Sequence, residues 1–350
     1  MVCSFLSLQF LLIYQVFQGT ETCDQHAEAV MYTDPIILEP SSLKEYNDSF
    51  FDFYPSKITL NHGYIHGLYP LESENMTDLI RYVKSVFNYN CPKETEVVIL
   101  IISDPTHYLI RHNIRETYGK NRASYHYTFS NPILINLKYY FLFSVGYRDD
   151  IALNQQVDLE AHIYNDIIRV PIFDTYREMA HKIIFTLYLL DKTNRSFEYV
   201  LKTDDDIFLK LNKIVPYLHS LEKNHVFIGY KAVGFIPLRD INNKWYVSER
   251  DYPNDVYEPF LLGFCYIFRR NIIQELTMAH YNSSLILMED IHISYLVTSL
   301  GYNLTHSPDF QYCTDLITCQ KSFLMDIGRD LRKRNLFWTI LKDPVALVEN

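Results

Sequence analysis

The sequence predicts an α/β fold, in which one sheet carries helices on both of its faces. Continuous apolar runs at residues 97–102, 139–143, 197–201 and 226–229 are typical of strands buried on both faces. A longer stretch with helical periodicity, residues 173–190, separates the second and third runs. Hydrophobic residues form 48% of the 350-residue chain, which is enough for a sizeable core.

Strands and helices are expected to alternate along the chain. After the first apolar run and its Ser-Asp-Pro turn, a helix is expected over residues 111–118, closed by Gly119. The long helix over residues 173–190 has Asp174 or Thr175 as its expected N-cap. Such alternation favours a sheet covered on both faces, with ligands bound beyond the carboxyl ends of its strands.

Three adjacent aspartates, Asp204, Asp205 and Asp206, directly follow the third apolar run. Neighbouring carboxylates repel one another, and a divalent cation such as Mg²⁺ or Mn²⁺ removes that repulsion. If the segment is extended, Asp204 and Asp206 project to one side and Asp205 to the other. One side would then hold a metal, and the other would reach a ribose hydroxyl.

Other readings of the acidic residues stay open at this point. The triplet fits a solvated turn as well, although the apolar residues on both sides favour a bound partner. An EF-hand fits poorly, because the required Gly and terminal Glu are absent at their spacing. A second acidic pair, Glu289 and Asp290, suits either a general base for a bound hydroxyl or the start of a helix.

Charge and the N-terminus restrict partners and compartment. The net charge of −10 and the lack of a long basic run exclude nucleic acid as an expected partner. Residues 2–17 are nearly all apolar and are expected to be a signal peptide or a short uncleaved membrane anchor. Both lead into the secretory lumen, as do five Asn-X-Ser/Thr acceptor triplets. The six cysteines form no C-x-x-C pair, which argues against zinc, and Cys313 and Cys319 are near enough in sequence to pair.

Several blocks occur in the order found in the animal β-1,3-glycosyltransferase family, which the chain resembles from about residue 96 to 305. The block KTDDDIF at 202–208 resembles the family's K-x-D-D-D-x-F, and EDI at 289–291 resembles its E-D-V. Four further blocks resemble family motifs: RHNIRETY at 111–118, Glu160 with Asp166-Ile167-Ile168, Asp174-Thr175-Tyr176 with Lys182, and KWYVS at 244–248 with Tyr252-Pro253, Tyr257 and Gly263.

The resemblance implies a fold, a location and a reaction. The expected fold is the GT-A type nucleotide-diphospho-sugar transferase fold, a Rossmann-like α/β/α sandwich behind an N-terminal membrane anchor. The expected protein is a single-pass type II Golgi membrane protein with a luminal catalytic domain. The expected reaction is an inverting, metal-dependent hexosyl transfer from a UDP-sugar to a glycan on a glycoprotein or glycolipid, with a β-1,3 linkage. Galactose is the first expected donor sugar, from residues 244–253, and N-acetylglucosamine is the alternative.

The resemblance also implies a domain order and residue roles. The order is a signal-anchor or signal peptide at 1–20, a luminal stem at 21–90, the catalytic domain at 91–320 and a C-terminal segment at 321–350. Mn²⁺, or Mg²⁺, would be held by Asp204, Asp205 and Asp206, and Asp290, beside Glu289, would be the general base. The residues expected to bind the donor nucleotide or a sugar are Arg111, Arg115, Asp174, Lys182, Asp204, Asp205, Trp245, Tyr252, Tyr257 and Gly263.

Some positions depart from the family pattern. Phe264 and Cys265 follow Gly263, where the family has small residues, and this crowds a place where the backbone approaches a sugar. A metal-binding His that the family often supplies near the end of the domain is absent; Cys319 or Gln320 stands in its neighbourhood, and His306 is a candidate substitute. These departures favour a catalytically silent luminal relative as the alternative to an active transferase. A secreted calcium-binding protein that uses Asp204, Asp205 and Asp206 is a further alternative.

Overall fold

The computed structural model describes residues 80–81, 83–84, 95–119, 139–193, 196–311, 313 and 322–342. Within these ranges no helix is both long and apolar enough to cross a membrane. The apolar segment at residues 2–17, most of the expected stem, Cys319 and Gln320 lie outside the described part of the chain. Cys265 is a buried free thiol, and Cys313 is disulfide-bonded.

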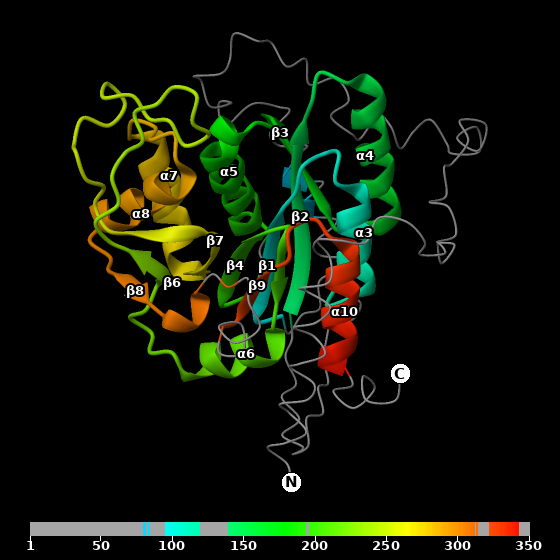
Figure 1. Ribbon diagram of the computed structural model, residues 1–350. Coiled ribbons are helices and arrows are strands. Elements are labelled where there is room, and N and C mark those ends of the chain that lie inside the picture. Colours follow the sequence, from blue (N-terminus) through cyan, green and yellow to red (C-terminus); the bar gives the residue numbers. More distant parts are fainter. Residues whose placement is uncertain are drawn as a thin grey trace, which may run out of the picture.

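One seven-stranded mixed sheet forms the centre of the molecule, in the order β3-β2-β1-β4-β7-β6-β8 (Figure 1). The strands β3, β2, β1 and β4 run parallel, whereas β7 lies antiparallel to both β4 and β6. The strand bounds are β1 Val97–Ile102, β2 Tyr139–Tyr147, β3 Ile167–Phe173, β4 Tyr199–Asp204, β6 Phe227–Ala232, β7 Phe260–Arg269 and β8 Leu304–His306. The insertion of β7 into the sheet was not predicted.

Helices cover both faces of the sheet, which confirms the predicted α/β class (Figure 1). Alternate side chains of β1 enter the two cores, with Ile99 on one face and Leu100 on the other. One face is covered by α3 Tyr108–Glu116, α4 Ile151–Tyr164, α6 Leu211–Ser220 and α10 Leu331–Lys342. The other is covered by α5 Met179–Asp191, α7 Ile273–Tyr281 and α8 Glu289–Ser299. Short 3₁₀ turns complete the fold: η4 Tyr176–Glu178, η5 Arg270–Ile272 and η6 Pro308–Phe310.

Two expected helices differ from the prediction at their starts. The helix expected over residues 111–118 begins earlier, at Tyr108, and ends at Glu116. The helix expected from residue 173 begins only at η4, because β3 continues to Phe173. Thr175, one of the two expected N-caps, holds that position without a side-chain hydrogen bond. Asp174 does not cap the helix; its Oδ2 instead accepts hydrogen bonds from Lys182 Nζ at 2.7 Å and from the Gly146 amide at 2.8 Å.

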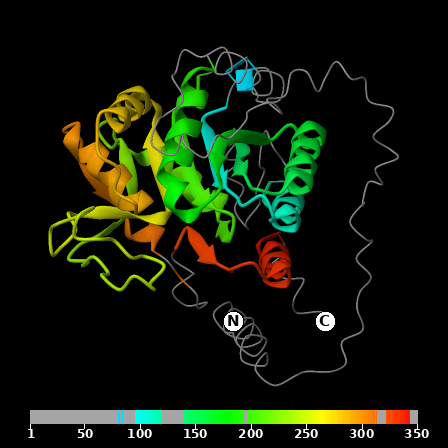
Figure 2. The ribbon, with the colours of Figure 1, turned by 90° about the horizontal axis from the view of Figure 1, so that it is seen from above.

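The C-terminal segment packs onto the same unit as the aspartate triplet. Strand β9, Leu324–Asp326, pairs antiparallel with β5, Ile207–Leu209, which begins directly after the triplet. Helix α10 lies beside α3, where Figure 2 shows it in red. Its buried Arg334 donates a hydrogen bond to the Asp205 carbonyl at 2.6 Å. The boundary expected at residue 320 therefore does not separate two packing units.

Candidate active site

A cavity of about 1100 Å³ opens at the carboxyl ends of β1 and β4. In the sheet register Ile102 lies opposite Asp204, so the loop after β1 and the aspartate triplet meet at one edge. The wall includes the triplet and also the acidic pair from the start of α8. Residues from four separate parts of the chain that the sequence marked as candidates thus share one hollow: Asp174 and Lys182; Asp204, Asp205 and Asp206; Trp245, Tyr257 and Gly263; Glu289 and Asp290.

The aspartate triplet lies in a turn, which corrects the expectation of an extended segment. Strand β4 ends at Asp204, and the chain turns at Asp205 and Asp206 before it returns as β5. All three aspartates line the cavity rather than alternating between two sides. Lys202 Nζ lies 2.8 Å from Asp204 Oδ1, and His107 Nδ1 donates to Asp205 Oδ2 at 2.8 Å.

The carboxylates of the turn differ in charge environment. Burial, together with Asp204, Asp205 and Asp326, raises the pKa of Asp206 to about 6. Burial also raises the pKa of Asp204, despite the nearby Lys202 ammonium. Burial alone would raise the pKa of Asp205 as well, but His107, Ser103 and Arg334 together outweigh the burial and lower that pKa. Asp206 is therefore the member of the triplet with the most uncompensated negative surroundings.

This donor set fits a hard divalent cation. Among the described residues no three His, Cys, Asp or Glu side chains form a ready-made metal cage. Mg²⁺ usually needs no such cage, because it binds through one or two carboxylates together with substrate phosphates and water. Carboxylate oxygens at the wall of a cavity, repelling one another, have the chemistry that such an ion requires.

The candidate replacements for the missing metal histidine do not all reach this site. The His306 side chain is not part of the cavity wall, and its Nδ1 accepts a hydrogen bond from the Lys231 amide at 3.1 Å. Cys319 and Gln320 lie outside the described residues. The sequence reasoning missed Asp326, which pairs with Ile207 in the β5–β9 ladder and raises the pKa of Asp206. Only the pairing of β9 with β5, which has no local sequence signal, brings it there.

The acidic pair lies in the first turn of α8, as the helix-start reading expected, and it also lines the cavity, so its position is compatible with the general-base prediction. Asp290 Oδ2 accepts from the Gly263 amide at 3.2 Å, and Oδ1 accepts from the Ile291 amide at 2.9 Å. Burial raises the pKa of Asp290 to about 6. Glu289 accepts a hydrogen bond from the Tyr266 hydroxyl, and burial raises its pKa to about 7. The Asp290 carboxylate is thereby fixed by two backbone amides and has a pKa suited to accepting a proton near neutral pH.

Gly263 allows this close approach, and its replacement by alanine tests the geometry. A Cβ at this position would lie 2.9 Å from Glu289 Oε2 and 3.3 Å from Asp290 Cβ. Because both side chains must move by a few tenths of an ångström, we expect Gly263→Ala to lower kcat by about tenfold. Melting temperature and kcat should be measured together. The crowding account is wrong if kcat stays at the wild-type value, or if it falls only as far as folded protein is lost.

Phe264 and Cys265, the two residues expected to crowd the site, differ in whether they reach the cavity. Phe264 lines the cavity, so it narrows the space near the acidic pair. The Cys265 side chain is fully buried in the core that holds α3 and α10. Only one of the two bulky residues therefore affects a ligand in the cavity.

The remaining predicted residues take up different positions in the wall. Asp174 and Lys182 line the cavity but bind each other, with 2.7 Å between Oδ2 and Nζ. Trp245 and Tyr257 belong to the loop between β6 and β7 and also line the cavity. Tyr252 does not; it packs behind Tyr257, with 4.8 Å between the ring centroids. Tyr252 thus supports the wall rather than forming it.

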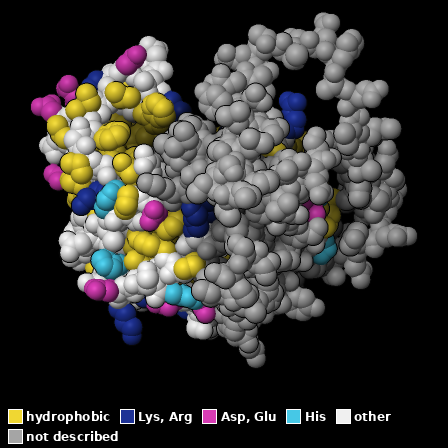
Figure 3. Space-filling model, turned by 60° about the horizontal axis from the view of Figure 1, so that its bottom comes forward, with side chains coloured by type: hydrophobic (Ala, Val, Ile, Leu, Met, Phe, Trp, Pro, Cys, Tyr) yellow, Lys and Arg dark blue, Asp and Glu magenta, His cyan; other side chains and the backbone are white. Residues whose placement is uncertain are grey.

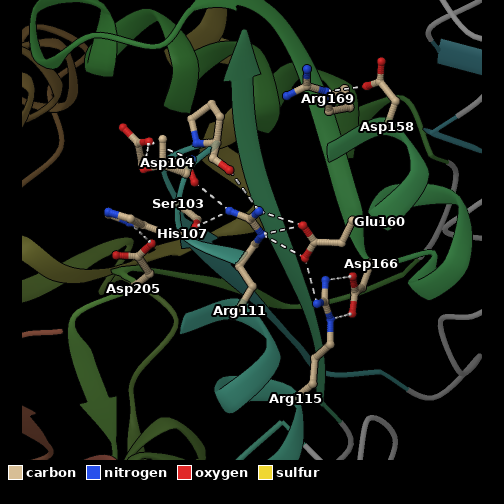
Figure 4. A network of polar contacts seen from close by, with 12 residues as sticks. Ser103, Asp104, His107, Arg111, Arg115, Asp158, Glu160, Asp166, Arg169 and Asp205 are labelled. Carbon is tan, nitrogen blue, oxygen red and sulfur yellow. Dashed lines mark hydrogen bonds and ion pairs between the residues drawn. The ribbon is translucent and has the colours of Figure 1, made fainter. Parts of the chain in front are cut away.

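Arg111 and Arg115 do not line the cavity, contrary to the expectation that they bind the nucleotide. Figure 4 shows their contacts with carboxylates instead. Both guanidinium groups are buried in an ion-pair network. Arg111 Nη2 lies 2.6 Å from Glu160 Oε2, while Arg115 lies 2.8 Å from both Glu160 and Asp166. Their charge is balanced by carboxylates more than 40 residues away in sequence, which a local motif does not reveal.

The network nevertheless reaches the cavity indirectly. Arg111 Nη1 donates to Ser103 Oγ at 3.0 Å and to the Asp104 carbonyl at 2.6 Å. Ser103 and Asp104 line the cavity just after β1 (Figure 4). Arg111 therefore positions the loop after β1 that forms one wall of the site, and Arg115 shares its Glu160 partner.

With this geometry in hand, the chain was compared with known proteins. The family described as Galactosyltransferase matches residues 110–308, which is more than half of the chain. The chain belongs to the galactosyltransferase family. This confirms the resemblance to the β-1,3-glycosyltransferases.

The names of two relatives of this galactosyltransferase family member refer to two different donor sugars. Beta-1,3-galactosyltransferase 1 of Mus musculus is 28% identical over 227 residues, covering 63% of this chain and 66% of its own length. UDP-GalNAc:beta-1,3-N-acetylgalactosaminyltransferase 1 of Homo sapiens is 26% identical over 260 residues, covering 72% of this chain and 76% of its own length. The chain therefore spans about two thirds of the length of the first of these relatives.

Solved structures resemble the galactosyltransferase chain only distantly. A glycosyltransferase involved in the glycosylation of the major capsid of PBCV-1 has a TM-score of 0.39 and 10% identity, covering 70% of this chain and 99% of its own. At that TM-score the likeness adds nothing to the fold described above.

Several cavity residues of this galactosyltransferase family member were missed by the sequence reasoning. His107, which holds Asp205, follows the Ser-Asp-Pro turn after β1, and that turn was the available signal. Arg148 lines the cavity and forms an ion pair with Asp104. Arg329 enters the wall from the loop after β9, next to the positive-φ Gly328. Arg148 and Arg329 give the acidic cavity positive charge suited to a phosphate-bearing ligand.

Three histidines, one each from α5, α7 and α8, form a chain of ring contacts. His181 Nδ1 lies 2.9 Å from His280 Nε2, and His280 Nδ1 lies 2.7 Å from His292 Nε2. The Ile286 amide donates to His292 Nδ1 at 3.2 Å, so His292 carries its proton on Nε2 and donates to His280. Burial lowers the pKa of His280 to about 3 and that of His292 to about 4.

These buried histidines predict a stability that falls in acid. Between pH 6.5 and the pKa values in the folded state, His280 and His292 bind protons in the unfolded chain but not in the folded chain. Their contribution to the unfolding free energy is therefore fully present above pH 6.5 and is lost as the pH falls. Between pH 7.5 and 5.5, we expect His280→Gln to lose about 1.4 kcal/mol less unfolding free energy than the wild type. Urea unfolding at both pH values measures this, with the surface variant His219→Gln as control. Equal losses in wild type and His280→Gln would contradict the assignment.

Proposed function

We propose that this chain is an inverting β-1,3-hexosyltransferase that transfers a sugar from a UDP-sugar to a glycan acceptor. The supporting observation is the single cavity that joins the aspartate turn at the end of β4 with Asp290 at the start of α8. A phosphate-binding metal site and a proton acceptor are the two parts that a direct displacement needs.

Asp290 is the proposed general base. Its carboxylate accepts the proton of the acceptor hydroxyl while the hydroxyl oxygen bonds to the anomeric carbon of the donor sugar. The bond from that carbon to the diphosphate breaks, and its electron pair leaves with UDP. One displacement from the opposite face inverts the anomeric configuration. With a pKa of about 6, Asp290 is ionised and able to act at neutral pH.

Mn²⁺ or Mg²⁺ is the proposed cofactor, held by Asp204 and Asp206 with Asp205 beside them. When bound, the ion supplies positive charge to the departing diphosphate. Asp205, fixed by His107, is the proposed partner of the nucleotide sugar hydroxyls. Arg329 is the proposed additional cation facing the diphosphate.

The donor, the fold type and the location belong to the same proposal. Galactose is the first donor, supported by residues 244–253 and by the name of the first relative; N-acetylgalactosamine, from the second, and N-acetylglucosamine are the alternatives. We assign the α/β/α unit to the GT-A type. We place it in the Golgi lumen behind a single type II membrane anchor, which the apolar residues 2–17 and the glycosylation triplets support.

A donor panel tests the proposal. The full-length protein is incubated with UDP-galactose, UDP-N-acetylgalactosamine or UDP-N-acetylglucosamine, with Mn²⁺ or a chelator, and with methyl β-lactoside or methyl β-N-acetylglucosaminide. We expect acceptor-dependent UDP release from one donor, abolished by the chelator. Tight UDP binding without transfer to any acceptor would instead favour a catalytically silent relative.

A further inference from the structure

The loop between β6 and β7, residues 233–259, exposes large apolar side chains beside the cavity. We call the following set the apolar rim, with the exposed fraction of each residue: Val233 65%, Phe235 53%, Ile236 63%, Leu238 37%, Ile241 74%, Trp245 51% and Val256 48%. Figure 3 shows hydrophobic side chains gathered at the upper left of the described surface, where this loop faces. A cluster of exposed apolar side chains of this kind indicates an interaction site.

The exposure of the apolar rim does not come from a loosely held loop. Arg239 donates to the carbonyls of Val247 at 2.9 Å and of Tyr252 at 2.8 Å, and so ties two arms of the loop together. The Tyr257 amide donates to the Phe235 carbonyl at 2.8 Å. Val247, Tyr252 and Tyr257 form a separate small core with residues of β7 and α8. Hydrogen bonds and a small core of its own thus hold the loop in place, and most side chains of the apolar rim are not part of that core.

The apolar rim is continuous with the cavity that holds Asp290. Val233, Phe235, Ile236, Leu238 and Trp245 belong to the cavity wall as well as to the exposed surface. An acceptor whose hydroxyl reaches Asp290 therefore leaves the cavity across this rim. The part of the acceptor next to its reacting sugar meets apolar side chains.

The composition of the apolar rim identifies the chemistry of that part. Sugar hydroxyls placed against Val, Ile and Leu side chains would lose hydrogen bonds to water without replacement. Aromatic rings suit the faces of sugars, but only Phe235 and Trp245 of the rim are aromatic. The aliphatic majority matches hydrocarbon, which gains free energy when it leaves water.

We propose that the acceptor is a lipid-linked saccharide, whose hydrocarbon next to the sugar lies across the apolar rim. This inference rests on the proposed transferase function and names its acceptor class. A glycan on a protein, which carries no hydrocarbon at that place, would gain nothing from the rim.

The test compares methyl and octyl glycosides of the same saccharide, β-lactose or β-N-acetylglucosamine, as acceptors for the full-length protein. We expect the octyl glycoside to have a KM at least about tenfold below that of the methyl glycoside, because part of its chain is buried. In Ile236→Ser/Ile241→Ser the ratio should fall below about threefold, since the burying surface is gone. Ile151→Ser, which removes an equally exposed isoleucine from the start of α4, should keep the wild-type ratio.

Either of two results would overturn the inference about the acceptor and leave the proposed transferase function intact. Equal KM values for the two glycosides in the wild type, or an unchanged ratio in the double variant, would do so while transfer itself still supports the proposed function. If no acceptor is used at all, the proposed function fails, and binding still tests the rim. In a Trp338→Phe background, the fluorescence of Trp245 should then shift on saturation with octyl β-lactoside and not with methyl β-lactoside. The absence of such a shift would contradict the rim assignment.

Discussion

Asparagine in place of Asp290 is expected to lower kcat for sugar transfer by about 10³-fold, while the dissociation constant of UDP changes by less than about threefold. The amide keeps the size of the side chain, but it cannot accept the proton of the acceptor hydroxyl. The hydrogen bonds from the Gly263 and Ile291 amides show that the carboxylate is held in place rather than drifting in solvent. Steady-state kinetics and UDP titration calorimetry measure the two quantities.

The matched control is Asp255→Asn, an exposed aspartate of the loop between β6 and β7 that lies outside the cavity wall. It should retain wild-type kcat. The acid limb of the wild-type rate profile should also fall tenfold per pH unit below about pH 6, because Asp290 loses its charge there. Full turnover by Asp290→Asn would remove the general-base role and leave the pair with a purely structural one.

The second large effect concerns Asp206. We expect Asp206→Asn to abolish the gain in UDP affinity that Mn²⁺ provides and to lower kcat/KM by about 10³-fold. Asp206 is the carboxylate whose surroundings, Asp204, Asp205 and Asp326, are most negative. Calorimetric titration of UDP with Mn²⁺ and with chelator measures the first effect.

The same variant separates a functional role from a structural one. Removal of one of several neighbouring negative charges should raise the unfolding free energy, measured without metal, by about 1 kcal/mol. Activity would thus fall while stability rises. If Asp206→Asn binds UDP with unchanged metal dependence, Asp206 is not a metal ligand. If it is both inactive and less stable than the wild type, its main role is in folding.

The sequence predicted those parts of the site that depend on short segments. The buried run before Asp204 defines a strand by its own composition, and ligands bind where such strands end, so the location of the triplet followed. The pair at Glu289 and Asp290 was also located from a short segment, because it directly precedes a periodic apolar stretch that predicts a helix. The start of the helix expected from residue 173 was predicted less accurately, because Asp174 accepts a hydrogen bond from Lys182 instead of capping the helix.

Features that depend on contacts between distant segments were not predictable. An arginine motif does not show whether its guanidinium groups face a ligand or distant carboxylates, and Glu160 and Asp166 decided that for Arg111 and Arg115. The position of β7 between β4 and β6 places Gly263 next to Asp290. The apolar sequence of β7 does not reveal that this strand runs antiparallel to its two neighbours. Asp326 likewise reaches the triplet only through the pairing of β9 with β5.

The most direct test of the account is the structure of the product. NMR of the saccharide formed by the full-length protein from the donor it accepts, with Mn²⁺ present, gives both the linkage position and the anomeric configuration. The account predicts a new β linkage to position 3 of the acceptor sugar, formed from the α-linked UDP-sugar. A product with retained α configuration would contradict it, because a single displacement assisted by Asp290 cannot give that product.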